Sequence, residues 1–209
     1  MKYRHVIFDL DGTVVNNEYV ILQSLQDMLR EVTGETHPHE ALKFSLGVPA
    51  YVPLDHFNLA DRDAALAAWG RHQIKYSHLA KPFPEVVRVL DHLRADGVEL
   101  GVVTSRTRNE YVEEFLPYGL GDKFGVTICA DDTERHKPEA DPMLEYLRRS
   151  GCAKSDALYV GDSQYDMLCA KAAGVDRAHA LWGTACPPHP DANYHFSSPQ
   201  ELLACVHSS

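Results

Sequence analysis

The feature that most constrains this chain is the segment at residues 6–13, VIFDLDGT. Its three consecutive apolar residues predict a strand buried on both faces, as found in parallel sheets covered by helices. The chain then turns acidic, and side chains two apart on an extended segment point the same way, so Asp9 and Asp11 can address one point. Two carboxylates at the end of a buried strand cost too much desolvation to be packing residues. We therefore expect a cation between them, most simply a metal ion.

Strand and helix patterns alternate from residue 85 onward. Strands are expected over residues 98–104, 126–130, 157–161 and 178–182, with helices between them. A last helix is expected to start at Ser198, because Ser198 and Glu201 have the spacing of a capping box. Repeated βα units predict an α/β fold, a doubly wound (Rossmann-like) parallel sheet with helices on both faces.

An all-helical insertion interrupts this pattern. Helical spacing is present around residues 21–32, 39–46 and 61–76, and no strand is expected among them. A proline-rich segment at residues 81–84 marks the return to the main domain. We expect an α/β core of residues 1–15 and 82–209 and a helical insertion of residues 16–81.

Composition narrows the class of partner. The 209 residues carry a formal net charge of −10, which disfavours nucleic acid or an anionic membrane as a partner. The five cysteines form no C-x-x-C pair and read as reduced thiols. With no signal peptide and no long apolar run, a cytoplasmic protein is expected.

Four polar clusters follow the predicted strands, whose carboxyl ends meet at one edge of a parallel sheet. They are the acidic segment above, residues 104–106 (TSR), residues 136–138 (HKP) and residues 161–166 (GDSQYD). Each alone is explained as a turn, a helix cap or a solvated loop, but the ordered set of four is specific. From residue 4 to about residue 183 the chain resembles the haloacid dehalogenase superfamily of phosphotransferases and phosphatases. It is most similar to the phosphoglycolate-phosphatase-like hydrolases, which carry a small helical cap where this chain has its insertion.

The resemblance implies a Mg²⁺-dependent phosphatase that works through an aspartyl-phosphate. Asp9 would be the nucleophile and Asp11 the general acid and base, with Thr104 and Lys137 completing the catalytic set. The residues support this chemistry independently, since a phosphate dianion repels a carboxylate unless a cation neutralises the charge. Mg²⁺ is a hard cation that takes carboxylate oxygens.

The expected ligand sets follow from the same motifs. The residues expected at the metal are Asp9, Asp11 (through its backbone carbonyl), Asp162 and Asp166. One of the last two would bind the metal, and the other can hold Lys137 instead. The residues expected at the phosphate or substrate are Gly12, Thr104, Ser105, Arg106 and Lys137. For Arg106, contact with the phosphate and exposure to solvent both remain open.

Several other functions fit the sequence less well. Dehalogenases of the superfamily lack the second Asp, which is present here as Asp11. Sugar-phosphate mutases usually carry a His about ten residues after that Asp, where this chain has Ile21, so a hydrolase is favoured. A phospho-accepting receiver-like switch has no room for the insertion, and a catalytically dead relative would not retain every catalytic side chain.

The substrate expected is a small phosphorylated metabolite. Phosphoglycolate is the first candidate by resemblance alone, and a sugar phosphate, a nucleotide monophosphate or pyrophosphate stay open. The segment at residues 47–49 resembles the loop through which caps of this family close over the site, which makes Lys43 and Tyr51 candidates for specificity. The sequence does not indicate the oligomeric state.

Overall fold

The computed structural model describes residues 1–209 except 47, 49, 184–186 and 208–209. The chain divides into two compact units. Met1–Val15 and Pro82–Ser209 form the first, which we call the core unit, and Asn16–Lys81 forms the second, the insertion unit. Short strands β2 (Val15–Asn16) and β3 (Lys81–Pro82) pair where the chain leaves and re-enters the core unit.

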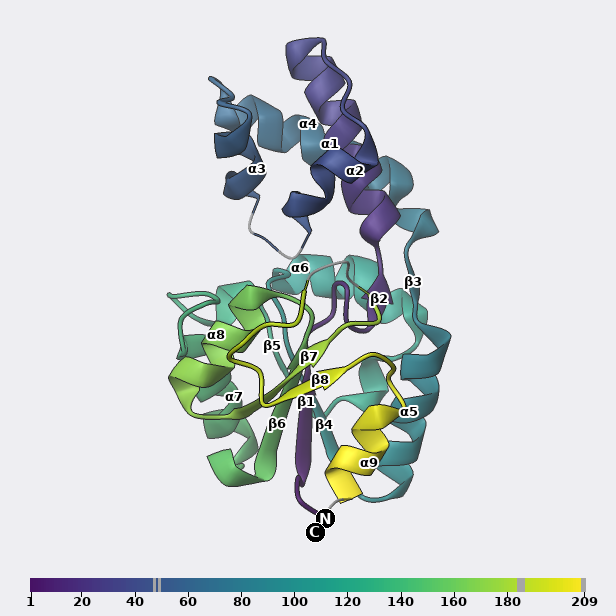
Figure 1. Cartoon of the computed structure of the whole chain (residues 1–209), viewed down its shortest axis with the longest axis vertical. Helices are drawn as coiled ribbons and strands as arrows, with labels where there is room; N and C mark the ends of the chain where they lie inside the picture. Colours follow the sequence, from purple (N-terminus) through teal and green to yellow (C-terminus); the bar gives the residue numbers. More distant parts are fainter. Residues whose placement is uncertain (47, 49, 184–186, 208–209) are drawn as a thin grey trace. The chain divides into compact units, whose positions relative to one another are not determined.

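The core unit is built on one six-stranded sheet (Figure 1). Its strands pair in the order β5-β4-β1-β6-β7-β8, and every pair is parallel. They are β1 (His5–Phe8), β4 (Glu99–Val103), β5 (Val126–Ile128), β6 (Ala157–Gly161), β7 (Asp176–Ala180) and β8 (Tyr194–Phe196). The central strand β1 is buried along Val6, Ile7 and Phe8, because both of its neighbours and both sheet faces are covered. The predicted α/β parallel-sheet fold is confirmed.

Helices pack against the sheet in two pairs. On one side in Figure 1, α7 (Asp141–Ser150) packs against α8 (Gln164–Ala173), and on the other α5 (Pro84–Ala95) packs against α9 (Glu201–His207). Tyr146 of α7 and Cys169 of α8 join Ile7 in one buried apolar cluster. A short helix α6 (Arg108–Glu110) runs directly into a π-helical turn, Tyr111–Phe115.

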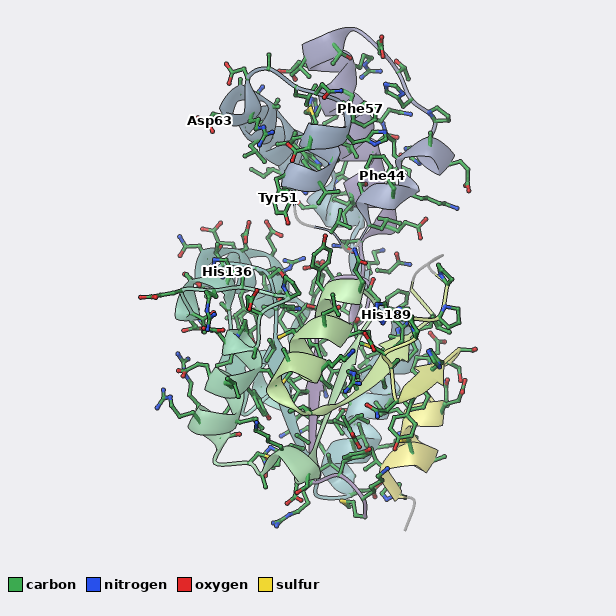
Figure 2. All side chains as sticks on the ribbon, turned by 60° about the vertical axis from the view of Figure 1, so that its left-hand side comes forward. Phe44, Tyr51, Phe57, Asp63, His136 and His189 are labelled. Atoms are coloured by element: carbon green, nitrogen blue, oxygen red, sulfur yellow. The ribbon has the colours of Figure 1, made fainter. Side chains whose placement is uncertain are left out.

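The insertion unit is helical, as its sequence pattern predicts. It contains α1 (Glu18–Thr33), α2 (His39–Leu42), α3 (Tyr51–His56) and α4 (Arg62–Tyr76). The long helices α1 and α4 pack together around Leu25, Met28 and Trp69. The rings of Phe44 and Phe57, both labelled in Figure 2, are also in contact, with centroids 6.1 Å apart.

Several sequence predictions were wrong in detail. Lys137 does not directly follow a strand, because β5 ends at Ile128 and a 3₁₀ turn (Ala130–Asp132) and a loop intervene. The last helix begins at Glu201, although the Glu201 carboxylate does accept a hydrogen bond from the Ser198 amide at 2.9 Å. The strand predicted at 178–182 is Asp176–Ala180.

The elements missed altogether include the short strands β2 and β3, helix α3 and strand β8. Helix α3 contains Pro53, which reads as a helix breaker but lies in the first turn, where proline is tolerated. Strand β8 is a three-residue edge strand whose middle residue, His195, is polar.

Of the described residues, no helix is long and apolar enough to cross a membrane. Cys129, Cys152, Cys169 and Cys205 are free thiols. Cys186, and Gly47 and Pro49 of the predicted closing loop, lie outside the described residues.

Candidate active site and metal centre

Three site residues follow three adjacent strands of the sheet. Asp9 comes directly after β1, Thr104 after β4 and Asp162 after β6. The ladder continues one residue past the strand ends: the Asp9 amide donates to the Val160 carbonyl at 2.9 Å, and the Thr104 amide to the Ile128 carbonyl at 3.0 Å. This pairing fixes the side chains at the carboxyl edge of the sheet, where open α/β folds bind ligands.

The centre of the site is a buried acidic cluster. Asp9, Asp162 and Asp166 are only 6%, 5% and 1% exposed, and one carboxylate oxygen from each lies within 4.8 Å of the others. The Lys137 ammonium donates to Asp9 Oδ1 at 2.7 Å and to Asp166 Oδ1 at 2.7 Å. Its third hydrogen bond goes to the hydroxyl of Tyr159, at 2.8 Å. Lys137 therefore lies between two carboxylates from separate parts of the chain.

The three carboxylates differ in how readily they ionise. Burial raises the pKa of Asp9 to about 7; Lys137 opposes this shift, and the charges of Asp166 and Asp11 add to it. Burial and the neighbouring charges of Asp166 and Asp9 also raise the pKa of Asp162 well above its usual range. Burial opposes ionisation of Asp166 too, but the charge and hydrogen bond of Lys137 outweigh it and lower that pKa.

This pattern reflects a shortage of positive charge. Three carboxylates surround one ammonium, so two negative charges are left over if all three ionise. Among the residues that the structure describes, the hydroxyl of Thr13 is the only side-chain donor to the Asp162 carboxylate, at 3.4 Å. A divalent cation would balance the surplus, and a set of three carboxylate oxygens suits Mg²⁺. The residues present therefore fit the predicted metal.

Gly12 brings the chain close to this cluster. Its φ of +78° lies in the left-handed region that glycine favours. A Cβ on Gly12 would stand 2.1 Å from Oδ2 of Asp162, a distance that real side chains do not reach. The glycine of the first motif is therefore required twice, for the turn after β1 and for room beside the Asp162 carboxylate.

Asp166 has a structural task as well as its place in the cluster. Its Oδ2 accepts hydrogen bonds from the Ser163 amide at 3.0 Å and the Ser163 hydroxyl at 2.6 Å, forming the capping box that begins α8. Its Oδ1 accepts from Lys137. One carboxylate thus connects the start of α8 to the lysine, which supports the expectation that one of the two motif aspartates holds Lys137.

Asp11 is engaged separately from Asp9. Both of its oxygens accept from Arg106, at 2.8 Å from Nε and 2.6 Å from Nη2. The remaining terminal nitrogen of Arg106, Nη1, donates to Glu114 at 2.8 Å. Arg106 is only 11% exposed, so it neither faces solvent nor stands free for a phosphate in this arrangement.

The other predicted residues lie at the same edge. Thr104 is buried, and its hydroxyl accepts from the backbone amide of Arg106 at 3.2 Å. Ser105 is exposed on the same turn. His136 is exposed beside Lys137 and belongs to the loop rather than to the cluster (Figure 2).

Three residues of the site were missed in the sequence. The Tyr159 hydroxyl lies 2.8 Å from Asp166 Oδ1, and a tyrosine in the middle of a buried strand was the available signal, since its hydroxyl needs a partner. His179 is buried and donates from Nε2 to the Asp162 carbonyl at 2.8 Å, while its Nδ1 accepts from the His189 amide at 3.1 Å. Glu114 had no sequence signal, because it is one of several acidic residues near the π-helical turn.

Buried strand-end carboxylates, a lysine and a hydroxyl on a parallel sheet are typical of α/β enzymes that bind a metal and phosphate. Comparison with known proteins agrees. Residues 6–180 match the family model described as haloacid dehalogenase-like hydrolase. The chain is 30% identical to the pyrophosphatase PpaX of Bacillus velezensis over 85% of this chain and 82% of that protein. It is also 30% identical to phosphoglycolate phosphatase 1 of Pseudomonas aeruginosa, over 86% of this chain and 70% of that protein.

A solved structure shows the same fold. A protein from Lactobacillus plantarum superposes with a TM-score of 0.89 at 27% sequence identity, covering 98% of this chain and 99% of that one. The chain therefore belongs to the haloacid dehalogenase-like hydrolase family. The predicted enzyme class, a phosphoric ester hydrolase, is confirmed at this level.

Proposed function

We propose that the protein is a Mg²⁺-dependent phosphatase that hydrolyses a small phosphorylated metabolite through an aspartyl-phosphate on Asp9. The observation that carries this proposal is the surplus of negative charge in the buried cluster of Asp9, Asp162 and Asp166. A structural ion pair would balance its charges, whereas a centre that binds a metal ion and a phosphoryl group keeps carboxylates in excess until both are bound.

In the first step, a carboxylate oxygen of Asp9 attacks phosphorus and the bond between phosphorus and the leaving oxygen breaks. Lys137, which already donates to Asp9 Oδ1 at 2.7 Å, orients the nucleophile and faces the charge of the transferring group. Thr104, at the end of the neighbouring strand, supplies a hydroxyl donor to the phosphoryl oxygens. Asp11 gives a proton to the leaving oxygen.

In the second step, Asp11 takes a proton from the water that attacks the aspartyl-phosphate. The new bond forms between water oxygen and phosphorus, the bond from phosphorus to Asp9 breaks, and inorganic phosphate leaves. Asp9, Asp162 and the backbone carbonyl of Asp11 are the groups we assign to the metal. When bound, Mg²⁺ offsets the repulsion between the Asp9 carboxylate and the phosphate dianion.

The names of two relatives support a substrate class. One is named a pyrophosphatase and the other a phosphoglycolate phosphatase. Pyrophosphate and phosphoglycolate both release an anionic leaving group, phosphate in one case and glycolate in the other. Phosphoglycolate remains the first candidate substrate. Pyrophosphate is the second, and the sequence identity to the pyrophosphatase favours it.

The test is phosphate release from p-nitrophenyl phosphate, with Mg²⁺ or with EDTA, by the wild type and by Asp9→Asn. We expect sustained turnover that needs Mg²⁺ and falls by more than about 1,000-fold in Asp9→Asn. Asp63→Asn is the matched control. Asp63 is exposed in the insertion unit (Figure 2), so this variant should retain phosphatase activity. Turnover insensitive to EDTA, or unchanged in Asp9→Asn, would contradict the proposal. A single burst of one p-nitrophenol per protein, with the phosphate retained on the protein, would indicate a phospho-accepting switch instead.

A further inference from the structure

The site holds a second cation, Arg106, which has no role in the two reaction steps proposed above. Arg106 binds both oxygens of Asp11 through Nε and Nη2, at 2.8 and 2.6 Å. This is the two-pronged geometry with which a guanidinium recognises a planar carboxylate or a phosphate. The carboxylate of Asp11 thus occupies the position at which Arg106 could hold an anion of the substrate.

Lys137 cannot perform this second task. Its ammonium has three N–H groups, and Asp9, Asp166 and Tyr159 accept one each at 2.7–2.8 Å. Its side chain is 5% exposed, so it is committed to the nucleophile and the start of α8. A second negative charge on the substrate, beyond the transferring phosphoryl group, needs a different partner.

Asp11 is a partner that Arg106 can exchange. Its side chain is 31% exposed, so the Asp11 carboxylate can turn to water at modest cost, unlike the carboxylates of the buried cluster. Glu114 comes from the π-helical turn that follows α6 and holds Nη1 at 2.8 Å, which keeps the guanidinium at the site when Asp11 leaves it. Asp11 is also the residue that must reach the leaving oxygen, so an anion bound to Arg106 would lie on the leaving-group side.

We propose that Arg106 is a specificity-determining residue that binds a carboxylate or phosphate carried by the leaving group and, in doing so, releases Asp11 towards the leaving oxygen. The inference rests on the proposed phosphatase function and names its substrate class: phosphoric esters or anhydrides with an anionic leaving group. A substrate with a neutral leaving group leaves the pair of Arg106 and Asp11 in place and is turned over less efficiently.

The test compares two phosphate esters that differ in one group. 2-Phosphoglycolate carries a carboxylate where 2-hydroxyethyl phosphate carries a neutral CH₂OH. We expect the wild type to prefer phosphoglycolate, and Arg106→Met to lower the ratio of the two kcat/KM values by roughly 30-fold, the value of one charge-assisted hydrogen-bonded pair. Arg106→Lys keeps the positive charge but cannot donate two parallel hydrogen bonds. Its ratio of kcat/KM values should therefore lie between those of Arg106→Met and the wild type. Pyrophosphate, compared in the same variants, reports whether a phosphate leaving group is selected as well.

Arg148→Met makes the same chemical change at a surface position of α7, 69% exposed, and should leave the ratio unchanged. An equal fall for both esters in Arg106→Met would overturn the inference, because Arg106 would then act only by positioning Asp11. Thermal melts of each variant check folding; if Arg106→Met does not fold, a ratio in Arg106→Lys equal to that of the wild type overturns it instead. A wild type that hydrolyses neither ester nor p-nitrophenyl phosphate refutes the proposed function itself, and the inference with it.

Discussion

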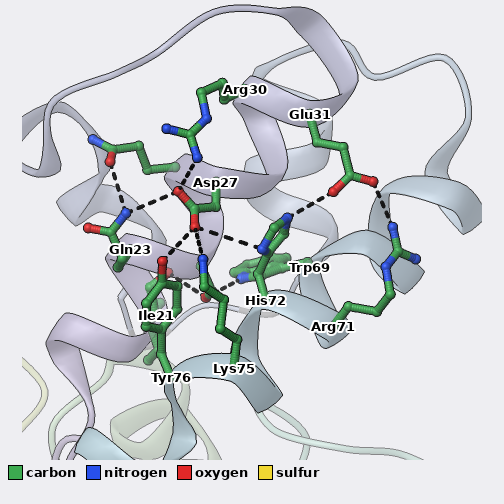
Figure 3. A network of polar contacts seen from close by, with 12 residues as sticks. Ile21, Gln23, Asp27, Arg30, Glu31, Trp69, Arg71, His72, Lys75 and Tyr76 are labelled. Atoms are coloured by element: carbon green, nitrogen blue, oxygen red, sulfur yellow. Dashed lines mark hydrogen bonds and ion pairs between the residues drawn. The ribbon is translucent and has the colours of Figure 1, made fainter.

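Each unit of this protein buries a cluster around a carboxylate, and the two clusters balance their charges differently. In the insertion unit, Asp27 is 3% exposed and accepts from Tyr76 at 2.6 Å, Arg30 at 2.9 Å and Lys75 at 3.2 Å (Figure 3). Two permanent cations face one buried anion. In the core unit, one ammonium, Lys137, faces three carboxylates.

The pKa directions follow from this difference. Burial opposes ionisation of Asp27, but the hydrogen bonds of Tyr76 and Lys75 and the charges of Lys75 and Arg30 lower its pKa. The pKa values of Asp9 and Asp162 are instead raised by burial and by like charges. The cluster of Asp27 has enough cations and joins α1 to α4, whereas the cluster of Asp9, Asp162 and Asp166 has too few and is where we propose that a cation and a phosphate bind. Surplus negative charge, rather than burial alone, distinguishes the candidate functional site.

The largest effect is expected for Lys137→Met. Removing the Lys137 ammonium leaves two buried carboxylates, Asp9 and Asp166, without their ion-pair partner, so the free energy of unfolding should fall by about 3–5 kcal/mol at pH 8 and phosphatase activity should be lost. Denaturant unfolding and phosphate release measure the two effects. Lys171→Met, in which a lysine that is 53% exposed loses its pair with Asp191, should change stability by less than about 1 kcal/mol. Equal losses in the two variants would remove the distinction between the clusters.

Two Asp→Asn substitutions, one in each cluster, are expected to change stability in opposite directions. In EDTA, Asp162→Asn removes a surplus charge and should raise the free energy of unfolding by about 1–3 kcal/mol, while keeping an oxygen for Thr13. Asp27→Asn removes the anion that two cations and a hydroxyl share, and should lower it by about 1–3 kcal/mol. Urea denaturation of the two variants measures the signs, and a shared sign would contradict the account.

A smaller effect is expected from pH. The native pKa of Asp9 is about 7, above the value of about 3.9 for an unfolded chain, so the native state binds more protons in between. Its contribution to stability is therefore present at low pH and is lost as the pH rises through 7. In thermal melts with EDTA, the wild type should have a lower Tm than Asp9→Asn at pH 8. The difference in Tm between the two proteins should be smaller at pH 5. The lowered pKa of Asp27 adds no pH dependence there, because Asp27 stays ionised from pH 5 to 8. A gap that is the same at both pH values would be evidence against a raised pKa for Asp9.

The core site was largely predictable, because sequence order and sheet topology coincide there. Asp9 and Asp162 each end a buried parallel strand, and neighbouring strand ends meet whatever the intervening loops do. Lys137 was expected directly after a strand, but a 3₁₀ turn and a loop separate it from β5. The pairing of Arg106 with Asp11 joins residues 95 apart and depends on side-chain directions that no periodicity encodes.

Asp27 shows the same limit in the insertion unit. Between Leu25 and Met28 it reads as an ordinary position on the edge of an apolar helix face, and its partners Lys75 and Tyr76 follow 48 and 49 residues later. Only the packing of α4 on α1 shows that the carboxylate is buried and shared. A sequence predicts which residues an element presents, but it does not give the balance of charge where two elements meet.

The most direct test of the central claim is a calorimetric titration of Mg²⁺ into the wild type, Asp162→Asn and Asp27→Asn. We predict that the wild type and Asp27→Asn bind one Mg²⁺ per chain with the same affinity, and that Asp162→Asn binds at least about tenfold more weakly, because the surplus charge that attracts the ion has been reduced. Uptake of Mg²⁺ by Asp162→Asn with the affinity of the wild type, or no uptake by the wild type, would contradict the account.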